Sequence, residues 1–192
     1  MAAIDLVQVL TAGDKTRQLW RHVIANGEFN EDKQILLDNQ VVNGKPGYFI
    51  YTPFKINGTE QHILINRGWL ASGLDRSKVP DLVRSNSAVT INGVIKEPPK
   101  TGVLLKELPP EQLNENTLRV QKLDVKQLQE FTGKELLPFI IRLEPDSDHG
   151  YKRDWRLPGS GEQVHQGYAF QWFAFASTLL IIYLVVNTKK VN

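Results

Sequence analysis

The residues with the most distinctive chemistry lie near the C-terminus, where His165 is followed by Tyr168 and Trp172. On a helix that extends back through His165, these three positions share one face. An imidazole is the usual proximal ligand of haem iron, and the two aromatic rings could line one edge of a porphyrin. The alternative is a histidine at a membrane surface that bonds lipid headgroups or a neighbouring loop. His165, Tyr168 and Trp172 are therefore candidate cofactor-binding residues, with His165 as the candidate ligand of haem iron.

Arg67 is the fourth candidate, because it follows the apolar run 63–65 and precedes Trp69. A guanidinium in such a strand must be paired or must face a polar surface. One interpretation is that Arg67 meets a haem propionate, since its planar fork suits carboxylates. The other is that Arg67 locks the fold by bonding carboxylate or backbone carbonyl groups. The sequence leaves both open.

The composition excludes several kinds of site. The chain has no cysteine and one methionine, so disulfides, zinc ribbons, thiol catalysis and soft copper sites are excluded. It has no nucleotide-binding loop, no G-x-S-x-G elbow and no H-E-x-x-H motif, and its other histidines show no metal-ligand spacing. A net charge of +2 without a basic block does not suggest nucleic acid. We predict that the chain is not an enzyme and does not bind nucleic acid.

The segment from Tyr168 to Val186 contains no charged residue. Its roughly 19 positions are enough for a helix to cross a ~30 Å hydrocarbon core. Aromatic residues at one end and Lys189-Lys190 at the other suit the two membrane interfaces. A buried core helix is the less favoured alternative, because the segment is terminal, unbroken and flanked by aromatic rings. The sequence predicts a transmembrane helix over 167–188 and a basic tail at 189–192.

The preceding stretch alternates short β-rich runs with turn signals. Asn43-Gly44 and Asn57-Gly58 predict hairpins, since type I′ turns need positive φ at both positions, and Asn92-Gly93 predicts a bulge or a turn. The run 63–65 is apolar on both faces, which predicts a central strand covered on both sides. We expect strands at 21–29, 34–39, 47–55, 61–70, 88–96, near 117–123, and at 139–143.

A short helix is expected at about 125–132, with Asp124 as its N-cap and Gly133 at its end. The fold class is therefore α+β. An antiparallel β-rich extramembrane domain, an open barrel or a sheet with a short helix, occupies 21–145. Residues 1–20 form an N-terminal segment whose apolar run is too short to span a bilayer, and residues 146–166 form a linker.

Three segments, in this order and with these separations, resemble the Surfeit locus protein 1 family. They are Gly47-Tyr48 followed by Thr52-Pro53-Phe54, Asn66-Arg67-Gly68-Trp69, and His165-x-Gly167-Tyr168-Ala169-x-Gln171-Trp172-Phe173. Two further stretches resemble the bacterial branch, namely Leu36-Leu37-Asp38-Asn39 and Gly150-Tyr151-x-Arg153-Asp154-Trp155. The resemblance extends from about residue 20 to the end.

This resemblance implies a membrane-anchored assembly factor for cytochrome c oxidase that assists the handling of haem a or its insertion into the catalytic subunit. The implied partners are that catalytic subunit, other assembly factors and the membrane. The family's haem-binding role would fall on His165, and Arg67 could meet the oxidase surface. The alternative is a scaffold that stabilises an oxidase intermediate without binding haem.

The resemblance also implies an integral protein of the cell inner membrane, with the β-rich domain on the periplasmic side. Basic residues both precede and follow the predicted span, so the positive-inside rule does not orient it. Family members are expected to carry a transmembrane helix before the sheet domain as well. Residues 1–20 do not supply it, and we expect the native gene to encode another hydrophobic segment upstream of Met1.

Overall fold

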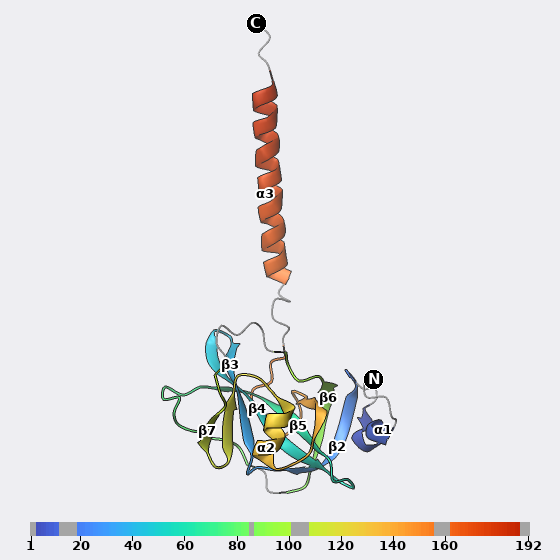
Figure 1. Ribbon diagram of the computed structural model, residues 1–192. Helices are drawn as coiled ribbons and strands as arrows, with labels where there is room; N and C mark the ends of the chain where they lie inside the picture. Colours follow the sequence, from blue (N-terminus) through green and yellow to red (C-terminus); the bar gives the residue numbers. More distant parts are fainter. Residues whose placement is uncertain (1–2, 12–18, 85–86, 101–107, 156–161, 189–192) are drawn as a thin grey trace. The chain divides into compact units, whose positions relative to one another are not determined.

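The computed structural model describes residues 3–11, 19–84, 87–100, 108–155 and 162–188, with side chains in the last range from Gln166 onward (Figure 1). The chain divides into two units, Met1–Asp154 and Trp155–Asn192.

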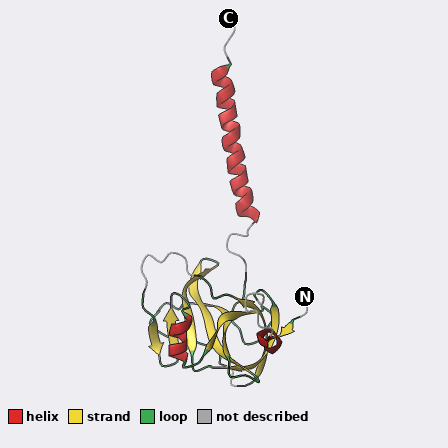
Figure 2. Cartoon of the chain, turned by 45° about the vertical axis from the view of Figure 1, so that its right-hand side comes forward, coloured by secondary structure: helices red, strands yellow, loops and turns green. Residues whose placement is uncertain are grey.

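Five strands of the first unit close into a barrel, because the first of them pairs with the last as well as with the second. In order around the barrel they are β2 (His22–Phe29), β6 (Val89–Lys96), β9 (Leu136–Leu143), β5 (His62–Ala71) and β4 (Lys45–Ile56). The closing contact pairs Gly27–Phe29 of β2 with Phe54–Ile56 of β4. Figure 2 shows these strands curving around one another, and closure removes free edges that would otherwise be open to other chains.

Four further pairings extend the sheet beyond the barrel. β3 (Gln34–Val42) pairs with β4, β8 (Thr117–Val120) pairs with β3, and β7 (Glu111–Asn114) pairs with β8. At the other end, β1 (Ile4–Asp5) pairs with β2. The predicted α+β, β-rich domain is confirmed. Most pairs are antiparallel, but β1–β2, β3–β8 and β5–β9 are parallel, which the sequence did not reveal.

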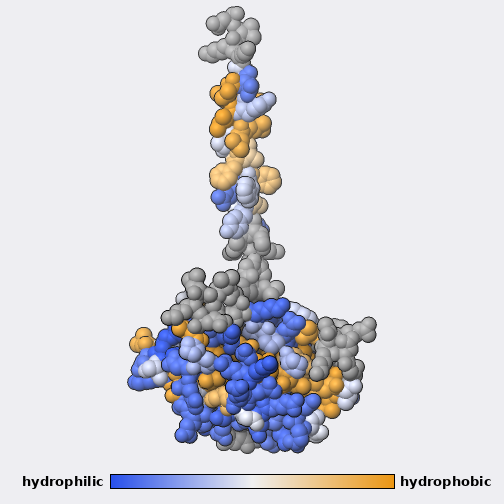
Figure 3. Space-filling view, in the orientation of Figure 1, coloured by the Kyte–Doolittle hydropathy of each residue, from blue (hydrophilic) through white to orange (hydrophobic). Residues whose placement is uncertain are grey.

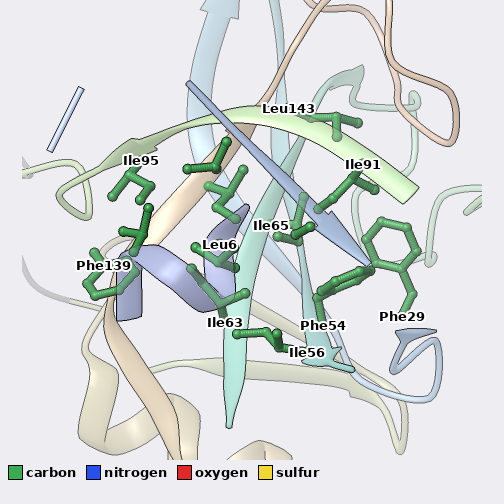
Figure 4. Packing of buried hydrophobic residues seen from close by; sticks show 14 residues of the cluster. Leu6, Phe29, Phe54, Ile56, Ile63, Ile65, Ile91, Ile95, Phe139 and Leu143 are labelled. Carbon is green, nitrogen blue, oxygen red and sulfur yellow. The ribbon is translucent and has the colours of Figure 1, made fainter. Parts of the chain in front are cut away.

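The central position predicted for the 63–65 run is confirmed. β5 lies between β9 and β4, and every residue from His62 to Trp69 is buried. Alternate residues of β5 serve two different cores. Ile63 and Ile65 join the barrel interior together with Leu6 of α1 (Leu6–Thr11), as Figure 4 shows. Leu64 faces a second cluster that α2 (Val125–Thr132) covers through Leu128.

The three Asn-Gly pairs behave differently. Asn43 and Gly44 have φ angles of 52° and 74°, which confirms the hairpin turn between β3 and β4. Asn57-Gly58 also joins two strands, but only Gly58 has positive φ, and the loop runs from residue 57 to 61. The expected bulge or turn at Asn92-Gly93 is wrong, since both residues pair in regular register with β2.

Close packing explains Gly93 instead. A Cβ at this position would lie 2.3 Å from Cγ2 of Ile141 and 2.8 Å from the carbonyl oxygen of Arg142 on β9. Glycine therefore lets β6 and β9 approach each other.

The predicted helix and its two ends are confirmed. Asp124 accepts hydrogen bonds from the backbone N–H groups of Lys126 and Gln127 at 3.0 and 3.3 Å. Gly133 follows the helix in the left-handed region, and its N–H donates to the carbonyl of Gln129 at 2.8 Å.

Other element boundaries differ from those predicted from the sequence. The N-terminal segment contains β1 and α1, β7 had no predicted counterpart, β3 continues to Val42, and β9 begins at Leu136. Within the expected linker 146–166, residues 150–152 pack against β5: the N–H of Tyr151 donates to the carbonyl of Arg67, and Lys152 pairs with Trp69.

The second unit contains α3 (Glu162–Asn187). Among the described residues it is the one helix long and apolar enough to cross a membrane, over the 22 residues Gln166–Asn187. These side chains are exposed along the whole stretch, and Figure 3 shows many of them in the apolar colour, whereas the face of the first unit seen there mixes hydrophilic and apolar residues. The prediction of a C-terminal apolar helix that could span a membrane is confirmed.

Candidate functional site

Arg67 lies at the centre of a buried polar cluster, which we call the Arg67 cluster and define as Arg67, Glu31, Gln34 and Thr52. The guanidinium Nη1 donates to both carboxylate oxygens of Glu31, at 3.0 and 3.1 Å, and to Oγ1 of Thr52 at 3.4 Å. Nε donates to the backbone carbonyl of His149 at 2.7 Å. Gln34 joins the cluster by donating to Glu31 at 2.5 Å and accepting from the hydroxyl of Thr52 at 2.7 Å.

Three neighbouring strands and one turn bring these residues together. Arg67 comes from β5, Thr52 from β4 and Gln34 from the start of β3, while Glu31 occupies the turn between β2 and β3. The N–H of Asn30 donates to the carbonyl of Pro53 at 2.7 Å, which fixes this turn against β4. The carboxylate of Glu31 is thereby held at the guanidinium.

The cluster is closed to solvent. The side chain of Arg67 is 0% exposed and that of Glu31 is 6% exposed. Two aromatic rings cover the guanidinium, whose Cζ lies 4.5 Å from the ring centre of Phe29 and 5.6 Å from that of Tyr151. Burial raises the pKa of the Tyr151 hydroxyl, and the positive charge of Arg67 acts in the opposite direction. Arg67 therefore meets a carboxylate from its own chain, as the fold-locking interpretation requires.

The neighbours of Arg67 in the motif 66–69 also have structural roles. Asn66 donates to the Tyr51 hydroxyl at 3.0 Å and accepts from the N–H of Gly68 at 3.0 Å. Burial raises the pKa of Tyr51 well above its ordinary value. Gly68 has a φ of 113°, and its missing Cβ leaves room for the carbonyl of Lys152. The indole of Trp69 donates to a backbone carbonyl of β3 at 2.9 Å.

The sequence did not identify Glu31 as the partner of Arg67. The two residues are 36 positions apart, and Glu31 stands in a polar turn with Asp32, where either carboxylate would look like an ordinary surface charge. The sequence indicated only that Arg67 needs a partner of opposite charge, because its guanidinium lies in an apolar strand.

The other three candidates belong to α3 in the second unit. This helix begins at Glu162, so the backbone at 165, 168 and 172 is helical and these positions share one face. Tyr168 is 60% and Trp172 is 71% exposed, and the Trp172 ring packs edge-on against Phe175 with centres 6.3 Å apart. The side chain of His165 lies outside the described residues.

The described residues contain no group of three histidine, aspartate or glutamate side chains that could hold a metal ion. His22 is instead paired with Glu144, with 2.5 Å between Nδ1 and the carboxylate oxygen. His62 is buried at the start of β5. Within the described residues of the first unit, a histidine that bound iron would therefore do so without a cluster of further metal ligands around it.

Comparison with known proteins gives a consistent relationship. A sequence profile of the SURF1 family matches residues 2–177. The chain is 28% identical over 192 residues to a SURF1-like protein of Rickettsia bellii, covering 95% of this chain and 73% of that protein. It is 30% identical over 176 residues to a SURF1-like protein of Rickettsia prowazekii, covering 87% and 68%.

A shorter match connects the chain to the cytochrome oxidase assembly protein SHY1 of Saccharomyces cerevisiae. It is 36% identical over 52 residues, which are 27% of this chain and 13% of the yeast protein. The family profile, by contrast, spans most of the chain, including the barrel strands, the Arg67 cluster and the first part of α3. The chain therefore belongs to the SURF1 family.

Proposed function

We propose that this protein is a membrane-anchored assembly factor for cytochrome c oxidase. The observation that carries the proposal is the match of the SURF1 family across residues 2–177, together with a relative named as a cytochrome oxidase assembly protein. The architecture supports it, because a closed barrel followed by a helix long enough to cross a membrane suits a protein that works beside a membrane enzyme. We propose no catalytic role for it.

Within this role, the protein assists the handling of haem a or its insertion into the catalytic subunit. The residues of α3 fit such a cargo: Tyr168 and Trp172 present large exposed rings on the face that includes position 165. An apolar macrocycle gains by resting against apolar surface rather than water, and a histidine is a suitable axial ligand of its iron. His165, Tyr168 and Trp172 would hold the haem.

Arg67 has a different part in this proposal. Its guanidinium is enclosed and already bonds Glu31, so it stabilises the barrel instead of touching haem in this conformation. The partners are the catalytic subunit of the oxidase and other assembly factors. The protein acts in the cell inner membrane with the barrel on the periplasmic side.

An absorption spectrum tests the haem part of the proposal. Detergent-purified protein from cells able to make haem a should show a Soret band. His165→Ala should remove or sharply weaken that band while expression and membrane insertion persist. His22→Ala is the matched control, since His22 is a half-exposed histidine of the barrel, and it should leave the band unchanged. An unchanged band in His165→Ala would place the ligand elsewhere.

A scaffold that stabilises an oxidase intermediate without binding haem is the second candidate. The observation that favours it is the closure of the Arg67 cluster, because the guanidinium is enclosed away from an external propionate, including Nη2, which has no hydrogen-bond partner among the described residues. Oxidase assembly in cells distinguishes the two candidates. A His165→Ala protein that lacks haem but still restores oxidase activity to a deletion strain would favour the scaffold.

A further inference from the structure

One end of the barrel carries exposed apolar side chains, on a surface that we call the tip and define as Val41, Lys45, Pro46 and Leu74. Val41, on β3, is 65% exposed, and Leu74, in the loop after β5, is fully exposed. Backbone pairing brings them together. Val41 pairs with Pro46 across the β3–β4 hairpin, and the carbonyl of Pro46 accepts hydrogen bonds from both the N–H and the hydroxyl of Ser72 at 3.1 Å. The tip is therefore continuous from β3 to the loop after β5.

The same end of the barrel is where the chain leaves the first unit. Lys152 pairs with Trp69 on β5, and the indole of Trp69 donates to the carbonyl of Gln40, the residue before Val41. Two contacts thus connect the last paired residue of the first unit to the tip. The connection to the membrane-crossing helix begins beside the tip.

This connection is short. Eight residue steps separate Asp154 from Glu162, where α3 begins. Even a fully extended chain of that length spans at most about 29 Å. The diameter of a domain of about 150 residues is roughly 40 Å. A connection shorter than the domain itself limits how far the exit of the first unit, and the tip beside it, can lie from the start of α3.

The charges of this end suit an anionic surface. Lys45 in the tip and Lys152 at the exit are exposed, and neither forms an ion pair among the described residues. Two of the acidic residues nearby are paired within the chain, since Asp75 pairs with Lys78 and Asp38 pairs with Arg76. Lysine side chains flanking exposed apolar residues are typical of segments that lie at the membrane interface.

We propose that the tip docks on the membrane surface, with Val41 and Leu74 inserted at the headgroup level and Lys45 and Lys152 against anionic lipid headgroups. Such a contact is weak by itself, but the tether makes it intramolecular and so raises its effective concentration. Docking would fix the orientation of the barrel over the bilayer. This proposal rests on the membrane insertion of α3 and is independent of haem binding.

The absence of cysteine allows a direct test in the full chain. Single cysteines replace Val41 or Leu74 and are labelled with the environment-sensitive fluorophore NBD in vesicles of phosphatidylcholine and phosphatidylglycerol. We expect blue-shifted emission at both positions, and quenching by phosphatidylcholine that carries a nitroxide near the headgroup. Replacing both Lys45 and Lys152 with glutamate, or omitting phosphatidylglycerol, should reduce the quenching.

Two control positions make the result unambiguous. Asn57→Cys labels an exposed position of the β4–β5 loop, at the opposite end of β4 from the tip, and should remain unquenched. Leu180→Cys labels α3 and should be quenched by a nitroxide deep in the acyl chains. Quenching at 180 with none at 41 or 74 would overturn the docking proposal. A blue shift at 41 and 74 without quenching would also overturn it, because the tip would then contact protein rather than lipid.

Discussion

Replacing Arg67 with methionine removes the guanidinium while keeping an unbranched side chain of similar reach. The carboxylate of Glu31 would remain buried without the two hydrogen bonds from Nη1. The carbonyl of His149 would lose its hydrogen bond from Nε as well. We expect this single change to destabilise the barrel strongly.

The magnitude follows from burial. The side chains of Arg67 and Glu31 are almost completely enclosed, at 0% and 6% exposure, so water would do little to screen a carboxylate left without its partner. Breaking a buried ion pair by removing one member typically costs about 3–5 kcal/mol. For a chain of this size that corresponds to a fall in Tm of roughly 6–20 °C. Few single changes on the surface would approach this value.

Thermal unfolding in detergent, followed by circular dichroism in the β-sheet region, measures the effect. Arg67→Met should unfold far below the native protein, and Glu31→Gln should also be destabilised. The double variant should recover part of the loss, because no charge is then left alone in the interior. A native Tm in Arg67→Met would refute this reasoning. If that variant also failed to support oxidase assembly, Arg67 would have a functional role instead.

Three further predictions concern other parts of the chain. Gly93→Ala should destabilise the barrel by about 1–3 kcal/mol, because the added methyl group would meet backbone and side-chain atoms of β9. Gly73→Ala should leave the Tm unchanged, because its methyl group would meet nothing closer than the carbonyl oxygen of Asp75 at 3.9 Å. Burial, reinforced by Lys134, lowers the pKa of His62 below its ordinary value of 6.5, so the unfolded chain binds the proton more readily. The stability from this residue is complete above about pH 6.5 and is lost as the pH falls below that value and through the lower pKa of the folded state, so His62→Gln should flatten the decline in Tm between pH 7 and pH 5. Finally, the full chain should stay in the membrane fraction after a carbonate wash; release into the supernatant would exclude α3 as an anchor.

The sequence by itself determined the features that depend on neighbouring residues. The α2 helix could be predicted with both ends because Asp124 and Gly133 act within one helical turn of it. The hairpin at Asn43-Gly44 could be predicted because its two residues supply the positive φ angles themselves. The apolar length of α3 and the doubly covered β5 are likewise local properties of composition and periodicity.

Only the tertiary structure decided which distant segments meet. The β2–β4 contact that closes the barrel and the three parallel pairings join strands whose residues carry no mark of their partners. Gly93 looked like a turn residue in the sequence. A glycine is needed there because β9, almost fifty residues further along the chain, packs closely against it. The same holds for Arg67, whose need for a counter-charge was evident from its apolar strand. That Glu31 meets that need follows from the fold, which brings the turn after β2 against β4 and encloses both charges away from water.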